Sequence, residues 1–189
     1  MHLIRWTLAA AMLAAAVLPV RAADDILDAI DQGRKAYQAG DLGTAKQQID
    51  LASQLIGQKN AENFAKLLPA ALPGWTAEKA QTQAAGVALL GASSAARTYT
   101  NAKGDNVEVS ITGDSAMIMQ FGPMLANPAL AAAMGKLIRV GSERGIQNQE
   151  GDVMLMVHNK FLINVRGSAD AASKLAYANA IDLAKLSKM

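Results

Sequence analysis

Asp152-Val-Met-Leu-Met-Val-His-Asn-Lys-Phe-Leu-Ile-Asn-Val-Arg-Gly167 is the stretch of sequence that decides the fold. It holds two mainly apolar runs, 153–157 and 161–165, separated by the polar triplet His158-Asn159-Lys160. This pattern is typical of a β-hairpin, and Asn159 can adopt the left-handed backbone conformation at low cost. Neither run alternates cleanly between apolar and polar residues. We therefore expect both faces of this hairpin to be covered and the hairpin to lie at the centre of a sheet.

The sequence on either side of this hairpin predicts further strands and a closing helix. Alternating apolar residues and Gly-containing turns predict strands over 87–90, 95–101, 107–112, 136–140 and 144–149. A terminal helix is expected from about Asp170 to Leu186, with its apolar side on the sheet. The predicted fold class is α+β: an N-terminal helical hairpin, then a mainly antiparallel sheet of about 5–7 strands packed with helices, including the C-terminal helix.

Two helices are expected ahead of the sheet. Asp24 and Asp25 can cap a helix that ends at Gly40-Asp41, and a second helix follows over 42–56. Asn60 is expected to cap a separate short helix, 61–68. The apolar residues expected to pack these helices together are Ile26, Leu27, Ile30, Ala36 and Tyr37 on the first, and Ala45, Ile49, Ala52, Leu55 and Ile56 on the second.

Residues 24–57 resemble a single tetratricopeptide repeat. The family's small, turn and packing positions are matched by Gly33, Gly40, Ala45, Ile49 and Ala52, whereas Tyr37 is one place late and Gly57 replaces the usual proline. No second copy follows downstream, and about three stacked repeats are needed to bury the faces of a solenoid. The resemblance therefore implies a docking hairpin attached to a larger domain rather than a peptide-binding array.

Residues 1–22 read as a secretory signal peptide. Arg5 precedes an apolar run, 8–18, that is too short to span a bilayer, and Val20-Arg21-Ala22 suits cleavage after Ala22. We therefore expect a soluble periplasmic or secreted chain with no integral membrane segment after cleavage. The expected units are 1–22 (signal), 23–68 (helical hairpin and short helix) and 69–189 (α+β sheet domain), with the boundary just before the rigid Pro69-to-Trp75 connection.

Charge and composition exclude several classes of function. Of 18 Lys and Arg, Arg5 and Arg21 leave with the signal, so 16 basic residues balance 16 acidic ones and nothing indicates nucleic-acid binding. The chain has no cysteine, and His158 is the one histidine beyond the signal, so common zinc, haem and Cys-His or Ser-His-Asp sites are not expected. No cofactor is predicted. A tip histidine such as His158 is more often solvated than functional.

The candidate binding site is the methionine-rich stretch from Met117 to Leu125. Its neighbouring apolar side chains, together with the sole tryptophan beyond the signal, form the tentative ligand or partner groove: Met117, Met119, Phe121, Met124, Leu125 and Trp75. The same stretch could instead be buried core under the helical hairpin, and Trp75 could be a plug on the edge of the core. Methionine thioethers could also bind Cu(I), although the interleaved apolar residues favour packing.

The sequence thus predicts a non-enzymatic periplasmic binding or accessory protein that contacts a protein partner or an apolar ligand. One alternative is a hydrolase with a carboxylate pair, either Glu108 with Asp114 or Glu143 with Glu150. A further alternative is a Cu(I)-handling protein with Met ligands.

Overall fold

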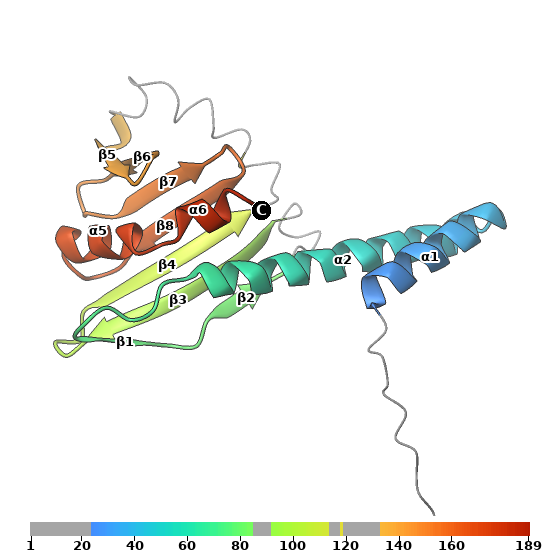
Figure 1. Cartoon of the computed structure of the whole chain (residues 1–189), viewed down its shortest axis with the longest axis horizontal. Helices are drawn as coiled ribbons and strands as arrows, with labels where there is room; N and C mark the ends of the chain where they lie inside the picture. The colour runs from blue at the N-terminus through green and yellow to red at the C-terminus, as the bar shows by residue number, and fades with distance from the viewer. Residues whose placement is uncertain (1–23, 85–91, 114–117, 119–132) are drawn as a thin grey trace, which may run out of the picture.

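A computed structural model describes residues 24–84, 92–113, 118 and 133–189 of the chain. The expected strand 87–90 lies outside these residues, as do Met117, Met119, Phe121, Met124 and Leu125 of the predicted groove. The described part contains an N-terminal helical pair, an antiparallel sheet and a C-terminal helical segment, which confirms the predicted α+β class (Figure 1).

The sheet has eight strands in the described part, against the expected five to seven, because two short strands both pair with one edge of β3. The strand order is β1-β3-β4-β8-β7-β6-β5, with β2 pairing β3 beside β1. The strands are β1 (Trp75–Ala77), β2 (Gln81–Gln83), β3 (Ser93–Asn101), β4 (Asn106–Gly113), β5 (Lys136–Val140), β6 (Glu143–Gln147), β7 (Val153–Val157) and β8 (Phe161–Arg166).

The predicted hairpin forms and lies inside the sheet. Strand β8 pairs with β7 on one side and with β4 on the other, so that Ile163 is flanked by Leu155 and Ile111. His158 and Asn159 both have positive φ, 52° and 55°, and the Lys160 N–H donates to the Val157 carbonyl at 3.0 Å. The left-handed conformation expected at Asn159 therefore extends to His158 as well.

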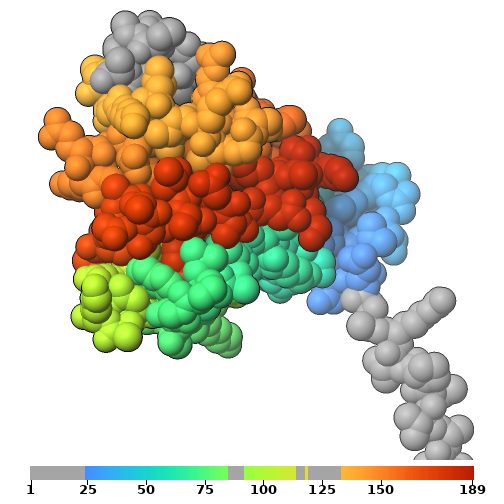
Figure 2. All heavy atoms as spheres, turned by 60° about the vertical axis from the view of Figure 1, so that its left-hand side comes forward, coloured from blue at the N-terminus to red at the C-terminus, as the bar shows by residue number. Residues whose placement is uncertain are grey.

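The two faces of the sheet differ in burial. Alternate side chains of β4, β7 and β8 are fully buried, among them Val109, Leu155 and Ile163, all 0% exposed. This buried face packs against the C-terminal helices and against the end of α2, which supplies Phe64 and Leu68. Figure 2 shows the C-terminal segment, in red, lying across the molecule above the C-terminal part of α2. Side chains on the opposite face of these strands are half-buried.

Helices α1 (Asp25–Gln38) and α2 (Leu42–Leu67) form the helical pair. Asp24 caps α1 as predicted, accepting hydrogen bonds from the backbone N–H groups of Ile26 and Leu27. The predicted break between 56 and 61 is wrong, because α2 runs unbroken through Gly57 and Asn60. Its buried stripe continues through Gly57, Ala61 and Phe64, so packing holds this segment helical where local signals favoured a stop.

The C-terminal helix is divided. Helix α5 (Ala171–Asn179) is capped by Asp170, whose carboxylate accepts from the Ser173 N–H at 2.7 Å. The expected single helix over 170–186 is wrong in its second half, because the chain turns after α5 and restarts as α6 (Leu183–Leu186). Asp182 caps this short helix through the Lys185 N–H. The turn places Ile181 and Leu186 in the core.

Candidate functional site

A groove runs between the two helices of the N-terminal pair, which projects away from the sheet (Figure 1). Its volume is about 540 Å³. The residues that line it recur every three or four positions on each helix; we call them the hairpin groove: Ile30, Gly33, Arg34, Tyr37, Leu42, Ala45, Lys46, Ile49 and Asp50. The structure therefore brings one stripe of each helix to a shared apolar surface.

The small residues make the contact between the helices, and the large ones stand beside it. Ala29 and Gly33 are buried on α1, and Ala45 and Ala52 on α2. A Cβ on Gly33 would lie 3.1 Å from the Ile49 Cδ1, so glycine permits this close approach. Several of the large apolar side chains expected to pack the two helices together are instead exposed: Leu27, Ile30, Tyr37, Ile49 and Ile56. Leu42, at the start of α2, is exposed as well.

Exposure is greatest where the groove meets the turn between the helices. Tyr37 is 68% exposed and Leu42 is 65% exposed. A cluster of large apolar side chains on the surface of a soluble chain marks an interaction site more often than a scattered single residue does. Two exposed ion pairs, Asp31 with Arg34 and Lys46 with Asp50, frame the groove and contribute little to stability.

A second hollow, of about 380 Å³, lies on the half-buried face of the sheet. Met134, Ile146 and Met154 give it an apolar floor, and it includes Asn164 and Arg166. Arg166 is already engaged, because its Nε and Nη2 donate to the Glu108 Oε1 at 3.0 and 2.7 Å. Met134 and Met154 thus line one hollow, and the two charged residues among its described lining, Asp152 and Arg166, are both already paired.

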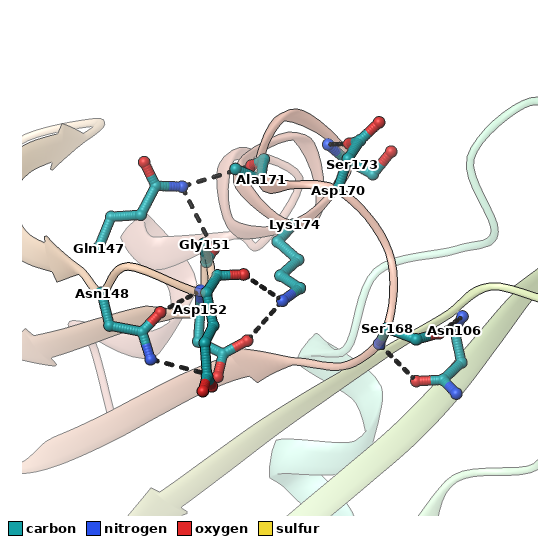
Figure 3. A network of polar contacts seen from close by, with 11 residues as sticks. Asn106, Gln147, Asn148, Gly151, Asp152, Ser168, Asp170, Ala171, Ser173 and Lys174 are labelled. Carbon is teal, nitrogen blue, oxygen red and sulfur yellow. Dashed lines mark hydrogen bonds and ion pairs between the residues drawn. The ribbon is translucent and has the colours of Figure 1, made fainter.

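A polar network beside this hollow fastens α5 to the sheet (Figure 3). The Lys174 side chain is 2% exposed, and its Nζ donates to the Asp152 Oδ1 at 2.6 Å and to the Glu150 carbonyl at 2.8 Å. Gly151 lies between these partners with a φ of 82°, and a Cβ there would lie 2.7 Å from the Cβ of Ala171. Close packing and a satisfied buried charge identify this network as a structural fastening rather than a reactive site.

Trp75 belongs to an aromatic cluster at the start of the sheet domain. Its ring meets the Tyr177 ring edge-on at 5.4 Å, and Tyr177 stacks at a tilt on Tyr99 at 4.3 Å. The Tyr99 hydroxyl donates to the Pro69 carbonyl at 2.6 Å, and the Leu72 N–H donates to the Tyr177 hydroxyl at 3.2 Å. Trp75 is half-buried on the connection that follows α2, and its ring packs against the edge of the core.

Burial raises the pKa of Tyr99 to about 12, and the nearby Arg97 partly offsets this rise. Since the unfolded tyrosine ionises near pH 10, the folded state gains stability that is complete below about pH 10 and is lost as the pH rises toward 12.

We predict that Tyr99→Phe costs about 1 kcal/mol at neutral pH, through loss of the Pro69 hydrogen bond, and reduces the fall in unfolding free energy over this alkaline range. Denaturant melts of both proteins across the range measure the effect, with the exposed Tyr37→Phe as the control. An unchanged alkaline fall in Tyr99→Phe would contradict the assignment.

Two of the four carboxylates considered for catalysis already have a cationic or histidine neighbour. Glu108 is bound by Arg166, and Glu143 places its Oε1 3.7 Å from the His158 Nε2 at the hairpin tip. Asp114 lies outside the described residues. Within the described ranges, no group of three or more His, Cys, Asp or Glu could hold a metal ion.

Sequence reasoning named five residues of the hairpin groove, but as packing or repeat positions and not as an exposed surface: Ile30, Gly33, Tyr37, Ala45 and Ile49. The signal that could have found it is the set of small residues at Ala29, Gly33, Ala45 and Ala52, at the spacing of a helix–helix contact. Small residues at the contact leave the larger neighbours uncovered. None of the helices in the part of the chain that the structure describes is long and apolar enough to span a membrane.

A functional assignment therefore has to start from the hairpin groove and the other features described above, because comparison with known proteins adds none. No protein-family model matches the chain, and no curated protein or solved structure is significantly similar to it.

Proposed function

We propose that the chain is an exported, non-enzymatic binding protein whose hairpin groove docks an amphipathic helix of a protein partner. The observation that carries this proposal is the exposed apolar lining of the groove, led by Tyr37 and Leu42. The tetratricopeptide-like spacing of the two helices supports the same kind of role, since such hairpins present a face to other chains.

The dimensions of the groove favour a helix as the ligand. Helix α1 has 14 residues and is therefore about 21 Å long, which matches a partner helix of similar length. Its lining positions 30, 33, 34 and 37 follow one face of the helix, as in helix-in-groove recognition, where side chains at i, i+3, i+4 and i+7 provide the contacts. The charged pairs at the rim leave the centre apolar, so an amphipathic partner can bury its apolar side there.

The proposal is tested with a synthetic amphipathic helix of about 14 residues, uncharged, with Leu at i, i+3, i+4 and i+7. Leu42→Glu is the preferred variant, because residue 42 is the first of α2 and an acidic side chain there suits the helix dipole. We expect peptide affinity, measured by fluorescence anisotropy, to fall at least about tenfold while the melting temperature stays unchanged.

Leu51→Glu is the matched control, since Leu51 is an exposed leucine of the same helix that does not line the groove. It should leave peptide affinity within a factor of about two. Absence of peptide binding to the unmodified chain, or equal losses in Leu42→Glu and Leu51→Glu, would refute docking at the groove.

A further inference from the structure

We propose that the free edge of β5 binds an acidic segment of a partner protein, which joins the sheet as a further antiparallel strand. Among the strands that the structure describes, β5 is the last in the sheet and pairs only with β6. Figure 1 shows it at the end of the sheet opposite to β1 and β2, which have three residues each against five in β5. The outward N–H and C=O groups of an edge strand can pair with an extended peptide. This surface is separate from the hairpin groove.

The side chains of β5 show that the strand is open to solvent. Lys136 and Arg139 are exposed, and Leu137 between them is 51% exposed. Leu137 pairs with Ile146, which pairs in turn with Met154, so that the three side chains form one apolar row across the sheet. An added strand can extend this row by placing an apolar side chain opposite Leu137.

The charge of this edge selects an acidic partner. Arg139 on β5 and Arg144 on β6 are directly opposite each other, on the same face of the sheet as Leu137. Both side chains are exposed, and among the residues that the structure describes neither has an ion-pair partner. Like charges in a cross-strand pair repel each other. A carboxylate on an added strand, opposite Arg139, relieves this repulsion and accepts hydrogen bonds from a guanidinium group.

The acidic residue of β6 does not neutralise the arginine pair. Glu143 precedes Arg144, and because side chains alternate along a strand it lies on the opposite face of the sheet. There its Oε1 is 3.7 Å from the His158 Nε2. Lys136, at the other end of β5, adds a further positive charge that has no ion-pair partner in the described ranges.

The same charges argue against a second copy of this chain as the added strand. Two β5 edges side by side would bring together Lys136 and Arg139 from each copy, with no acidic residue on either strand. Basic side chains at a sheet edge prevent self-pairing in this way. A strand that carries carboxylates turns the same charges into an attraction, and the edge therefore discriminates between the two kinds of partner.

The register of β5 defines the sequence of a probe. In an antiparallel added strand, an acidic residue opposite Arg139 is followed two positions later by an apolar residue opposite Leu137, and then by an acidic residue opposite Lys136. The fluorescently labelled peptide Thr-Thr-Glu-Val-Leu-Glu-Thr has this order, with residues that favour extended structure at most other positions.

Fluorescence anisotropy of this peptide with the purified full chain is the first test. We expect binding that weakens as salt is added, because exposed charges are screened. A peptide with Lys in place of both Glu should bind at least about tenfold more weakly. The acidic peptide should lose affinity by a similar factor for a variant with Arg139→Glu and Arg144→Glu.

The matched control is a variant with Lys79→Glu and Lys103→Glu. It makes the same change in net charge at exposed positions between β1 and β2 and between β3 and β4, at the other end of the sheet. Its affinity for the acidic peptide should stay within a factor of about two. Leu42→Glu should also leave this affinity unchanged, because the hairpin groove takes no part in the contact.

Alternating N-methylation of the peptide tests whether it binds as a strand. In an antiparallel pair, only every second residue of the added strand directs its N–H toward the neighbouring strand. Methyl groups on the N–H groups that face β5 should abolish binding, whereas methyl groups on the alternate N–H groups should leave it nearly unchanged. The two methylated peptides have the same charge, so a purely electrostatic contact would not distinguish them.

Three results would overturn the inference. Absence of binding of the acidic peptide to the unmodified chain would show that the basic residues only protect the edge. Equal affinities of the two methylated peptides would show attraction without strand pairing. Full affinity for the variant with Arg139→Glu and Arg144→Glu would place the contact elsewhere. Circular dichroism and melting temperature show whether this variant is folded; if it is not, Arg139→Gln with Arg144→Gln removes the charges without reversing them and takes its place.

Discussion

Lys174→Met is expected to lower the free energy of unfolding by about 3 kcal/mol, or roughly 6–12 °C in melting temperature for a chain of this size. The Lys174 ammonium is buried and holds both the Asp152 carboxylate and the Glu150 carbonyl. Methionine preserves most of the side-chain volume, so the loss arises from the polar partners that are left without the ammonium. Thermal and denaturant melts measure the change.

Lys185→Met provides the control for this prediction. Lys185 pairs with Asp182 at 3.1 Å, but its side chain is 73% exposed, so its removal should change stability by less than about 0.5 kcal/mol. Adding Asp152→Leu to Lys174→Met should restore part of the lost stability, because an apolar pair avoids the unpaired carboxylate. Equal melting temperatures for Lys174→Met and Lys185→Met would show that the buried pair contributes nothing to stability.

Leu155→Asp is expected to abolish folding, whereas Met156→Asp should leave a folded chain. The two residues are neighbours on β7 but lie on opposite faces of the sheet: Leu155 is fully buried and Met156 is half-buried. Burial of an unpaired carboxylate costs several kcal/mol out of a total stability of about 5–15 kcal/mol. At Met156 the carboxylate can reach solvent, so the expected cost is about 1 kcal/mol.

Soluble yield and a cooperative denaturant transition distinguish these variants. Ile163→Asp should behave like Leu155→Asp, since the two residues are paired across β7 and β8. If Leu155→Asp and Met156→Asp gave similar yields and similar transitions, the difference between the two faces of the sheet would be refuted.

Local patterns were sufficient to predict the centre of the fold. The apolar runs on either side of His158-Asn159-Lys160 predicted β7 and β8, and the positive φ expected at Asn159 is present. Asp24 and Asp170 were predicted to begin helices and do so, because a short acidic side chain satisfies the free N–H groups of a first turn. In each case the signal and the structure it specifies lie within a few residues.

Features that depend on distant contacts could not be predicted in this way. The burial of Lys174 contradicts the usual exposure of a helix lysine, and its partner Asp152 is 22 residues away. The break between α5 and α6 falls at Ala180-Ile181-Asp182, where no Gly or Pro marks an end, and it follows from the packing of Ile181 and Leu186. The hairpin groove went unrecognised for a related reason. Whether a side chain is exposed depends on whether another part of the chain packs over it, and the local sequence does not show this.

The place of β8 in the sheet has a consequence for the order of events during synthesis. Among the described strands, β1 to β4 and β5 to β7 form two antiparallel groups that are joined in the sheet through β8, which follows all of them in the sequence. A nascent chain therefore cannot join its two groups until residue 166 has emerged, and the part of the buried face that α5 and α6 cover stays open until they follow. Such late, long-range pairing is slow compared with local folding. A chain built in this way keeps part of the apolar face of its sheet open to solvent until its synthesis is nearly complete.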